Sequence, residues 1–92
     1  MVTVHLPEIL DIRAASPLTG ELLNARGRHL TIDASNVRKL GAQCVQVLLS
    51  ARATWTADGY SLVVIEPSES FLDSLQTLGV AIADISEQEP AR

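Results

Sequence analysis

The sequence contains few aromatic residues and almost no cysteine. Aromatic residues make up 3% of the 92 residues, although hydrophobic types together reach 47%. The core must therefore consist of Val, Leu, Ile and Ala, which suits helices packed against a sheet. The single cysteine, Cys44, excludes an intramolecular disulfide and a cysteine-based metal cluster.

Positive charge is also scarce. Seven Lys and Arg residues stand against eleven Asp and Glu residues, for a net charge of −4. Without a basic cluster, nucleic-acid binding would lack its main electrostatic contribution, and we do not expect it. The sequence has no long apolar run and no signal-peptide-like segment, so we expect a cytoplasmic protein without direct membrane insertion.

The sequence contains no motif typical of a metal site or a cofactor site. His5 and His29 have no third ligand at metal spacing, and no glycine-rich phosphate loop is present. The acidic residues are spread along the chain rather than paired with a histidine. Asp33 ends a strand like the phospho-aspartate of a receiver, but the accompanying acidic pair and lysine are missing. We therefore expect no enzyme activity, no cofactor and no small-molecule substrate.

Hydrophobic periodicity predicts alternating strands and helices. We expect strands at 2–6, 29–33, 60–65 and 80–83, and helices at 14–25, 41–57 and 68–78. The order β-α-β-α-β-α-β predicts a single α/β domain over residues 1–85, with helices packed on a mainly parallel sheet. The apolar run 60–65 indicates a central strand covered on both faces. We expect the polar segment 86–92 to form a disordered tail.

The order of several short motifs resembles the STAS domain, the domain of anti-sigma factor antagonists. The motifs are Leu10-Asp11 after the first strand, Ile32-Asp33-Ala34-Ser35 before a long apolar helix, and the strand 60–67. The resemblance covers roughly residues 3–79 and implies a STAS-like fold. We expect only one strand before Asp11, whereas the family usually has an additional N-terminal strand.

The loop at which a partner kinase phosphorylates some STAS proteins differs here. Its usual form is Asp-Ser-Ser/Thr-Gly-Leu, and the matching residues are Gly41-Ala42-Gln43-Cys44-Val45. Ala42 and Gln43 offer no hydroxyl group, so that phosphoswitch is not expected. Ser35 lies elsewhere, at the start of the preceding loop, and we interpret it as a turn residue rather than a phosphorylation site.

A closer resemblance is to short STAS-like proteins associated with alphaproteobacterial chemotaxis systems. It rests on Leu-Gly-Ala-Gln-Cys-Val-Gln-Val-Leu-Leu at 40–49 and on the following segment to Asp58-Gly59. It implies a non-catalytic adaptor that binds the chemotaxis histidine kinase and modulates phosphate flow to response regulators. Two alternatives remain open: an anti-sigma factor antagonist regulated by a serine kinase, and a STAS subunit of a lipid-transport ATPase complex.

The surface around the long helix start is the expected partner-binding site. Arg38 and Lys39 form its one positive spot in an acidic protein. The expected binding residues are Ser35, Asn36, Arg38, Lys39, Gly41, Ala42, Gln43 and Gln46.

Overall fold

A three-stranded parallel sheet forms the centre of the protein, with strand order β1-β3-β5. The computed structural model describes residues 2–87. The elements are β1 (Val2–His5), β2 (Ile9–Leu10), α1 (Ile12–Asn24), β3 (Leu30–Asp33), β4 (Lys39–Leu40), α2 (Ala42–Asp58), β5 (Leu62–Ile65), α3 (Glu69–Thr77) and the 3₁₀-helix η1 (Ile82–Asp84). The predicted α/β fold with three helices and a mainly parallel sheet is confirmed.

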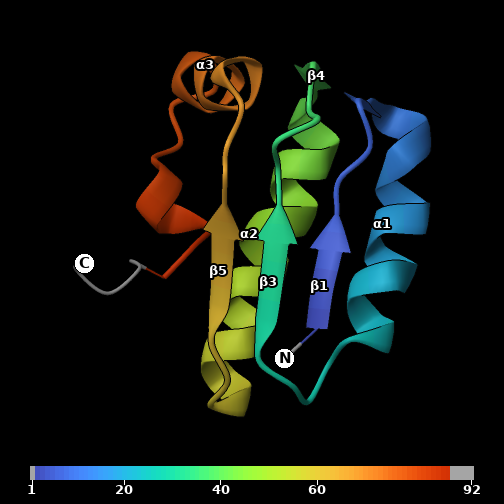
Figure 1. The fold of residues 1–92 in the computed structure, drawn as a ribbon, viewed down its shortest axis with the longest axis vertical. Helices are drawn as coiled ribbons and strands as arrows, with labels where there is room; N and C mark the ends of the chain where they lie inside the picture. The colour runs from blue at the N-terminus through green and yellow to red at the C-terminus, as the bar shows by residue number, and fades with distance from the viewer. Residues whose placement is uncertain (1, 88–92) are drawn as a thin grey trace.

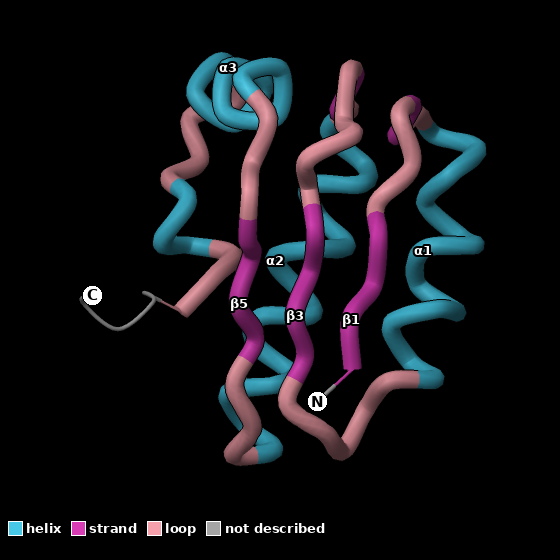
Figure 2. The backbone as a smooth tube through the Cα atoms, in the orientation of Figure 1, coloured by secondary structure: helices cyan, strands magenta, loops and turns pink. Residues whose placement is uncertain are grey.

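Helices α1 and α2 cover one face of this sheet, and no described helix covers the other (Figures 1 and 2). The strand register aligns Val4, Ile32 and Val64 in one row, and all three are buried toward the helices. The alternating residues point to the other face, because successive side chains of a strand point to opposite sides. The core therefore lies between the sheet and the two helices, where it includes Leu48 and Trp55.

The predicted central position of the strand at 60–65 is wrong. β5 is an edge strand, and its residues alternate between buried Leu62 and Val64 and half-buried Val63 and Ile65. The continuous apolar run arises because the open face of the sheet also carries apolar side chains at this edge. An apolar run of four residues therefore does not distinguish a central strand from an edge strand.

The predicted strand at 80–83 is also wrong, because η1 forms there instead. The Asp84 carboxylate accepts a hydrogen bond from the Ala81 N–H at 3.0 Å, and the Asp84 N–H donates to the Ala81 carbonyl at 2.9 Å. This tight turn leads Ile85 into the core, where its side chain is 0% exposed. Local side-chain hydrogen bonding thus replaces pairing with the sheet.

Two residues of the expected tail are held against β5. The Val64 N–H donates to Ser86 Oγ at 2.8 Å, and the Glu87 N–H donates to the Leu62 carbonyl at 2.8 Å. The rest of that expected tail, 88–92, lies outside the described residues. The outer edge of β5 is therefore occupied, whereas no described strand pairs with the outer edge of β1.

Candidate protein-binding surface

A short second ladder joins the starts of α1 and α2. Strands β2 and β4 run parallel, with Ile9 opposite Lys39 and Leu10 opposite Leu40. The Glu8 carbonyl accepts hydrogen bonds from the N–H groups of Arg38 and Lys39, at 2.8 and 3.1 Å. This ladder was not predicted, and the expectation of a single strand before Asp11 is wrong, because β2 is a second one. It places both helix starts side by side at the carboxyl end of the sheet, where α/β proteins commonly bind their ligands.

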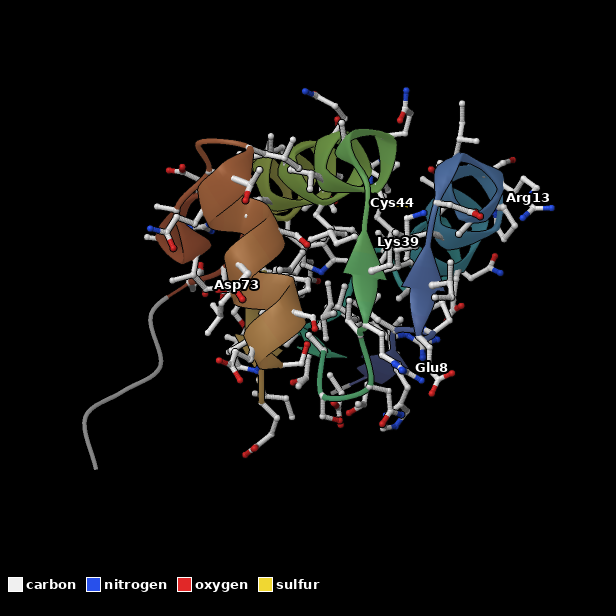
Figure 3. The ribbon with its side chains drawn as sticks, turned by 90° about the horizontal axis from the view of Figure 1, so that it is seen from above. Glu8, Arg13, Lys39, Cys44 and Asp73 are labelled. Atoms are coloured by element: carbon white, nitrogen blue, oxygen red, sulfur yellow. The ribbon has the colours of Figure 1, made fainter. Side chains whose placement is uncertain are left out.

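The outer side of this ladder is exposed. Leu10 and Leu40 are buried, so their neighbours Ile9 and Lys39 project away from the core. Figure 3 shows the same end of the molecule from above, with α3 beside β4 and β2 on its other side. The Ser68 hydroxyl holds the start of α3 in place, because it donates to the Val37 carbonyl at 2.6 Å and accepts from the Phe71 N–H at 3.1 Å.

The two helix starts differ in charge. At α1 the Asp11 carboxylate accepts a hydrogen bond from the Arg13 N–H at 3.0 Å. At α2 the cap is Gly41, which offers no side-chain hydrogen bond, and the first turn contains no acidic residue. The positive end of the α2 dipole therefore lies exposed beside Lys39, without a carboxylate of the helix to offset it.

Close packing explains why a glycine occupies position 41. Its N–H donates to the Leu10 carbonyl at 2.8 Å. A Cβ atom at this position would lie 3.3 Å from the same carbonyl oxygen and 4.0 Å from the Asp11 Cα. A larger side chain would therefore require the β2–β4 ladder to shift by a few tenths of an ångström.

A shallow cleft separates the start of α2 from α3. Its volume is about 270 Å³, and it is lined by Leu40, Gly41, Ala42, Asp73, Ser74, Thr77 and Leu78. Exposed apolar side chains accompany it: Leu78 is 42% exposed, Ile9 48% and Ile12 67%. We call the exposed residues at this end of the molecule the cap surface: Ile9, Ile12, Lys39, Ala42, Gln43, Asp73 and Leu78.

A family model described as "Mlab, STAS domain" matches residues 1–85. The chain belongs to the STAS domain family. No curated protein matches it. Membership supports a regulatory or adaptor role of the STAS type, and STAS domains are generally non-catalytic. Separately, no helix within residues 2–87 is long and apolar enough to cross a membrane.

In this STAS domain the segment that matches the phosphorylatable loop forms the start of α2. Ala42 and Gln43 are exposed in its first turn, at the edge of the cleft or beside it. Neither side chain carries a hydroxyl group. An aspartate at position 41, as in the family pattern, would crowd the ladder, because its Cβ atom would lie 3.3 Å from the Leu10 carbonyl oxygen.

The structure divides the eight predicted binding residues between the two ends of β4. Ser35, Asn36 and Arg38 belong to the loop that enters β4, and the remaining five lie on β4, on the α2 cap or on the first two turns of α2: Lys39, Gly41, Ala42, Gln43 and Gln46. The Ser35 N–H donates to Asp33 Oδ1 at 2.9 Å, so Ser35 is part of a turn. Four residues of the cap surface were not among the predicted ones: Ile9, Ile12, Asp73 and Leu78.

A polar cluster on the open face of the sheet is not arranged for nucleophilic catalysis. Asp33 lies between His5 and Ser35: its Oδ2 is 3.4 Å from His5 Nδ1, and its Oδ1 accepts from the Ser35 N–H. Hydrogen bonds from Ser35, together with His5, lower the pKa of Asp33. A nucleophilic serine requires a base next to its hydroxyl group, and here the carboxylate separates histidine from serine.

Cys44 is equally unsuited to reaction. It is 0% exposed, and its Sγ donates to the Asp11 carbonyl at 3.3 Å. Burial, and then the nearby Asp11 charge, raise the pKa of the thiol, so the reactive thiolate is disfavoured. In the described part of the chain, no three His, Cys, Asp or Glu residues are grouped to hold a metal ion.

Proposed function

We propose that the protein is a non-catalytic adaptor that docks its cap surface on the histidine kinase of a bacterial chemotaxis system. Occupation of the kinase's phosphotransfer region would change the flow of phosphate to response regulators. The observation that supports this proposal is the exposed, uncharged start of α2 beside Lys39, at the end of an otherwise acidic protein. The choice of a chemotaxis kinase rests on the sequence resemblance over residues 40–59.

The chemistry of the cap surface suits an acidic group on the partner. The first N–H groups of α2 lack a side-chain cap, and the ammonium group of Lys39 adds a full positive charge close by. A carboxylate or phosphate on the partner would gain from both, and the attraction would weaken as salt is added. Because Ala42 and Gln43 cannot be phosphorylated, this attraction does not depend on a phosphate on the loop.

Apolar side chains of the cap surface supply the non-directional part of the interaction. Ile9, Ile12 and Leu78 are each at least 42% exposed, so docking would remove apolar area from water. Their charged neighbours, Lys39 and Asp73, have opposite signs and would fix the orientation of the partner. Exposed apolar residues with a charged surround are typical of the centre and rim of a protein interface.

Isothermal titration calorimetry with the purified kinase tests this proposal. We expect Lys39→Glu and Gln43→Glu each to weaken binding about tenfold, since each puts a negative charge where the partner's acid would lie. The matched control is Arg28→Glu, which makes the same charge reversal at the opposite end of the molecule, after α1. It should leave the affinity within about twofold.

The outcomes separate the surface from the partner. If the wild-type protein binds the kinase and both cap variants bind equally well, the cap surface is the wrong site. If the wild-type protein does not bind at concentrations up to about 100 μM, the kinase assignment fails. Binding to a lipid-transport ATPase in the same assay would then assign the alternative partner. Where the kinase binds, transfer of labelled phosphate to the response regulators should change on addition of the wild-type protein.

A further inference from the structure

The outer side of α1 and α2 is almost free of charge. The two helices contain four charged residues: Arg13, Glu21, Arg52 and Asp58. Glu21 lies on the side of α1 toward β1, where it lines a different cavity together with Val2 and Thr3. Arg13 lies in the first turn and pairs with the adjacent Asp11. After its first turn, α1 therefore carries no charge on the side that faces α2.

Of the two charged residues of α2, one lies away from this side and the other is paired with an opposite charge. Arg52 lies on the far side of the helix, where it approaches Glu87 at 3.5 Å. Asp58 ends the helix and accepts hydrogen bonds from Arg26 at 2.8 and 3.2 Å, so the two charges compensate each other. Between the helices lies an uncharged strip on a protein with a net charge of −4.

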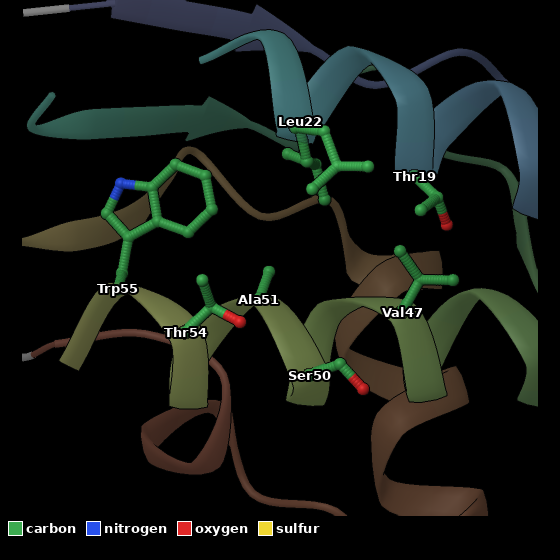
Figure 4. A pocket seen from close by; sticks show the side chains of 8 residues that line it. Thr19, Leu22, Val47, Ser50, Ala51, Thr54 and Trp55 are labelled. Atoms are coloured by element: carbon green, nitrogen blue, oxygen red, sulfur yellow. The ribbon is translucent and has the colours of Figure 1, made fainter. Parts of the chain in front are cut away.

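A groove runs along this strip (Figure 4). Its volume is about 220 Å³, and it is lined by Thr19, Leu22, Leu23, Val47, Ser50, Ala51, Thr54 and Trp55. Small side chains on α2 leave the space open, and the buried indole of Trp55 closes one end. Leu23 stands at the rim of the groove and is 58% exposed.

We propose that this groove is the interface of a symmetric dimer, with Leu23 of each copy inserted into the groove of the other. In a two-fold dimer the same surface meets itself, so a charged surface would place like charges together. The uncharged strip avoids this repulsion between two acidic copies. The face also offers both parts of a self-complementary contact: an exposed apolar side chain and an apolar groove beside it. This inference is independent of the proposed function.

The size of the face suits a modest dimer. Helix α2 has 17 residues, which at ~1.5 Å per residue gives a length of about 25 Å. Two neighbouring helices present a width of about 20 Å, so each copy would bury roughly 500 Å². This equals about 1,000 Å² in total, the minimum for a biological interface, and we therefore expect weak association with a dissociation constant in the micromolar range.

Sedimentation equilibrium between roughly 10 μM and 1 mM measures the expected association. The mean mass should rise with concentration from 9.9 kDa toward twice that value. Leu23→Glu and Ser50→Glu should each weaken association about a hundredfold, because each buries an unpaired carboxylate at the contact. The matched control is Leu72→Glu, which changes another exposed leucine, 41% exposed on α3, and should associate like the wild type.

Disulfide trapping tests the geometry itself. A Leu23→Cys protein mixed with a Thr54→Cys protein should form a cross-linked heterodimer under mild oxidation, whereas the buried native Cys44 should stay unmodified. Circular dichroism of each variant confirms that it is folded. A monomer at 1 mM would overturn the proposal. A dimer that Leu23→Glu leaves intact would also overturn it. If Thr3→Pro then weakens association, the contact between the two copies lies at the edge of β1.

Discussion

Replacement of Trp55 by phenylalanine should lower the free energy of unfolding by about 2–3 kcal/mol. The indole is 2% exposed, and its Nε1–H donates to the Arg28 carbonyl at 2.7 Å. Loss of that donor costs about 1–2 kcal/mol, because the carbonyl loses its partner. The smaller phenyl ring also leaves roughly 40 Å³ of space, which at ~24 cal/mol per Å³ adds about 1 kcal/mol.

Urea denaturation followed by far-ultraviolet circular dichroism measures this loss. With a denaturant dependence near 1 kcal/mol per molar urea, the midpoint should fall by about 2–3 M. The control is Tyr60→Phe, which removes one hydroxyl group from a side chain that is 37% exposed and keeps its edge contact with His29. It should change stability by less than about 0.5 kcal/mol.

A small effect of Trp55→Phe would refute the reasoning. If the midpoint falls by less than about 0.5 M, the indole N–H does not make a stabilising bond and the ring is not closely packed. Trp55 would then not form the rigid end of the groove between α1 and α2.

Four further results are expected. Hydrogen bonds from Ser35 hold the pKa of Asp33 below its ordinary value of 3.8. The stability that this carboxylate contributes is therefore present above pH 3.8 and is lost as the pH falls through the lower pKa of the folded state. Asp33→Asn should lose less stability on acidification than the wild type, and equal losses in an acid titration would contradict this. Iodoacetamide should label Cys44 slowly in the native protein and rapidly in urea, since burial raises its pKa; rapid native labelling would show an open core. Ser86→Ala should cost about 1–3 kcal/mol in urea denaturation, because the Val64 N–H loses its acceptor; a neutral result would mean that Ser86 does not close the edge of β5. Mass spectrometry after incubation with a cognate serine kinase should find no phosphate on Ser35, and its detection would support the anti-sigma factor antagonist alternative.

The helices were predictable because their signals are local. The long helix was predicted at 41–57, where Cys44, Leu48, Ala51 and Trp55 recur at helical spacing, and all four are buried in α2. The spacing of these residues is enough to define one face of a helix. The strand predicted at 29–33 is also observed, as β3 at Leu30–Asp33, although its burial does not alternate: Leu30, Thr31 and Ile32 are all buried.

The arrangement of the edges was not predictable from local patterns. The ladder of β2 and β4 has two residues in each strand, too few to show a period, and it joins segments about thirty positions apart. Similarly, the apolar residues at 80–83 have the composition of a strand, but the Asp84 carboxylate stabilises a turn there. Pairing over long sequence distances and side-chain capping decided both cases.

For the candidate site, the sequence indicated the residues on one segment but not their neighbours. Lys39, Ala42 and Gln43 follow one another closely and could be recognised as a helix start. Ile9 and Leu78 join them only through tertiary packing, which places these two exposed apolar side chains at the same end of the molecule. In the sequence, only the isoleucines on either side of Leu10-Asp11, Ile9 and Ile12, could have indicated that this segment belongs to the site.

The different edges of the sheet limit how molecules of this protein could aggregate. Ser86 and Glu87 occupy the outer backbone groups of β5, whereas no described strand pairs with the outer side of β1. Growth of an extended β-ribbon needs two free edges on every molecule, one to receive a strand and one to offer a strand. With a single free edge, strand pairing between molecules ends at a pair. Fibrous growth would first have to detach the segment at Ser86.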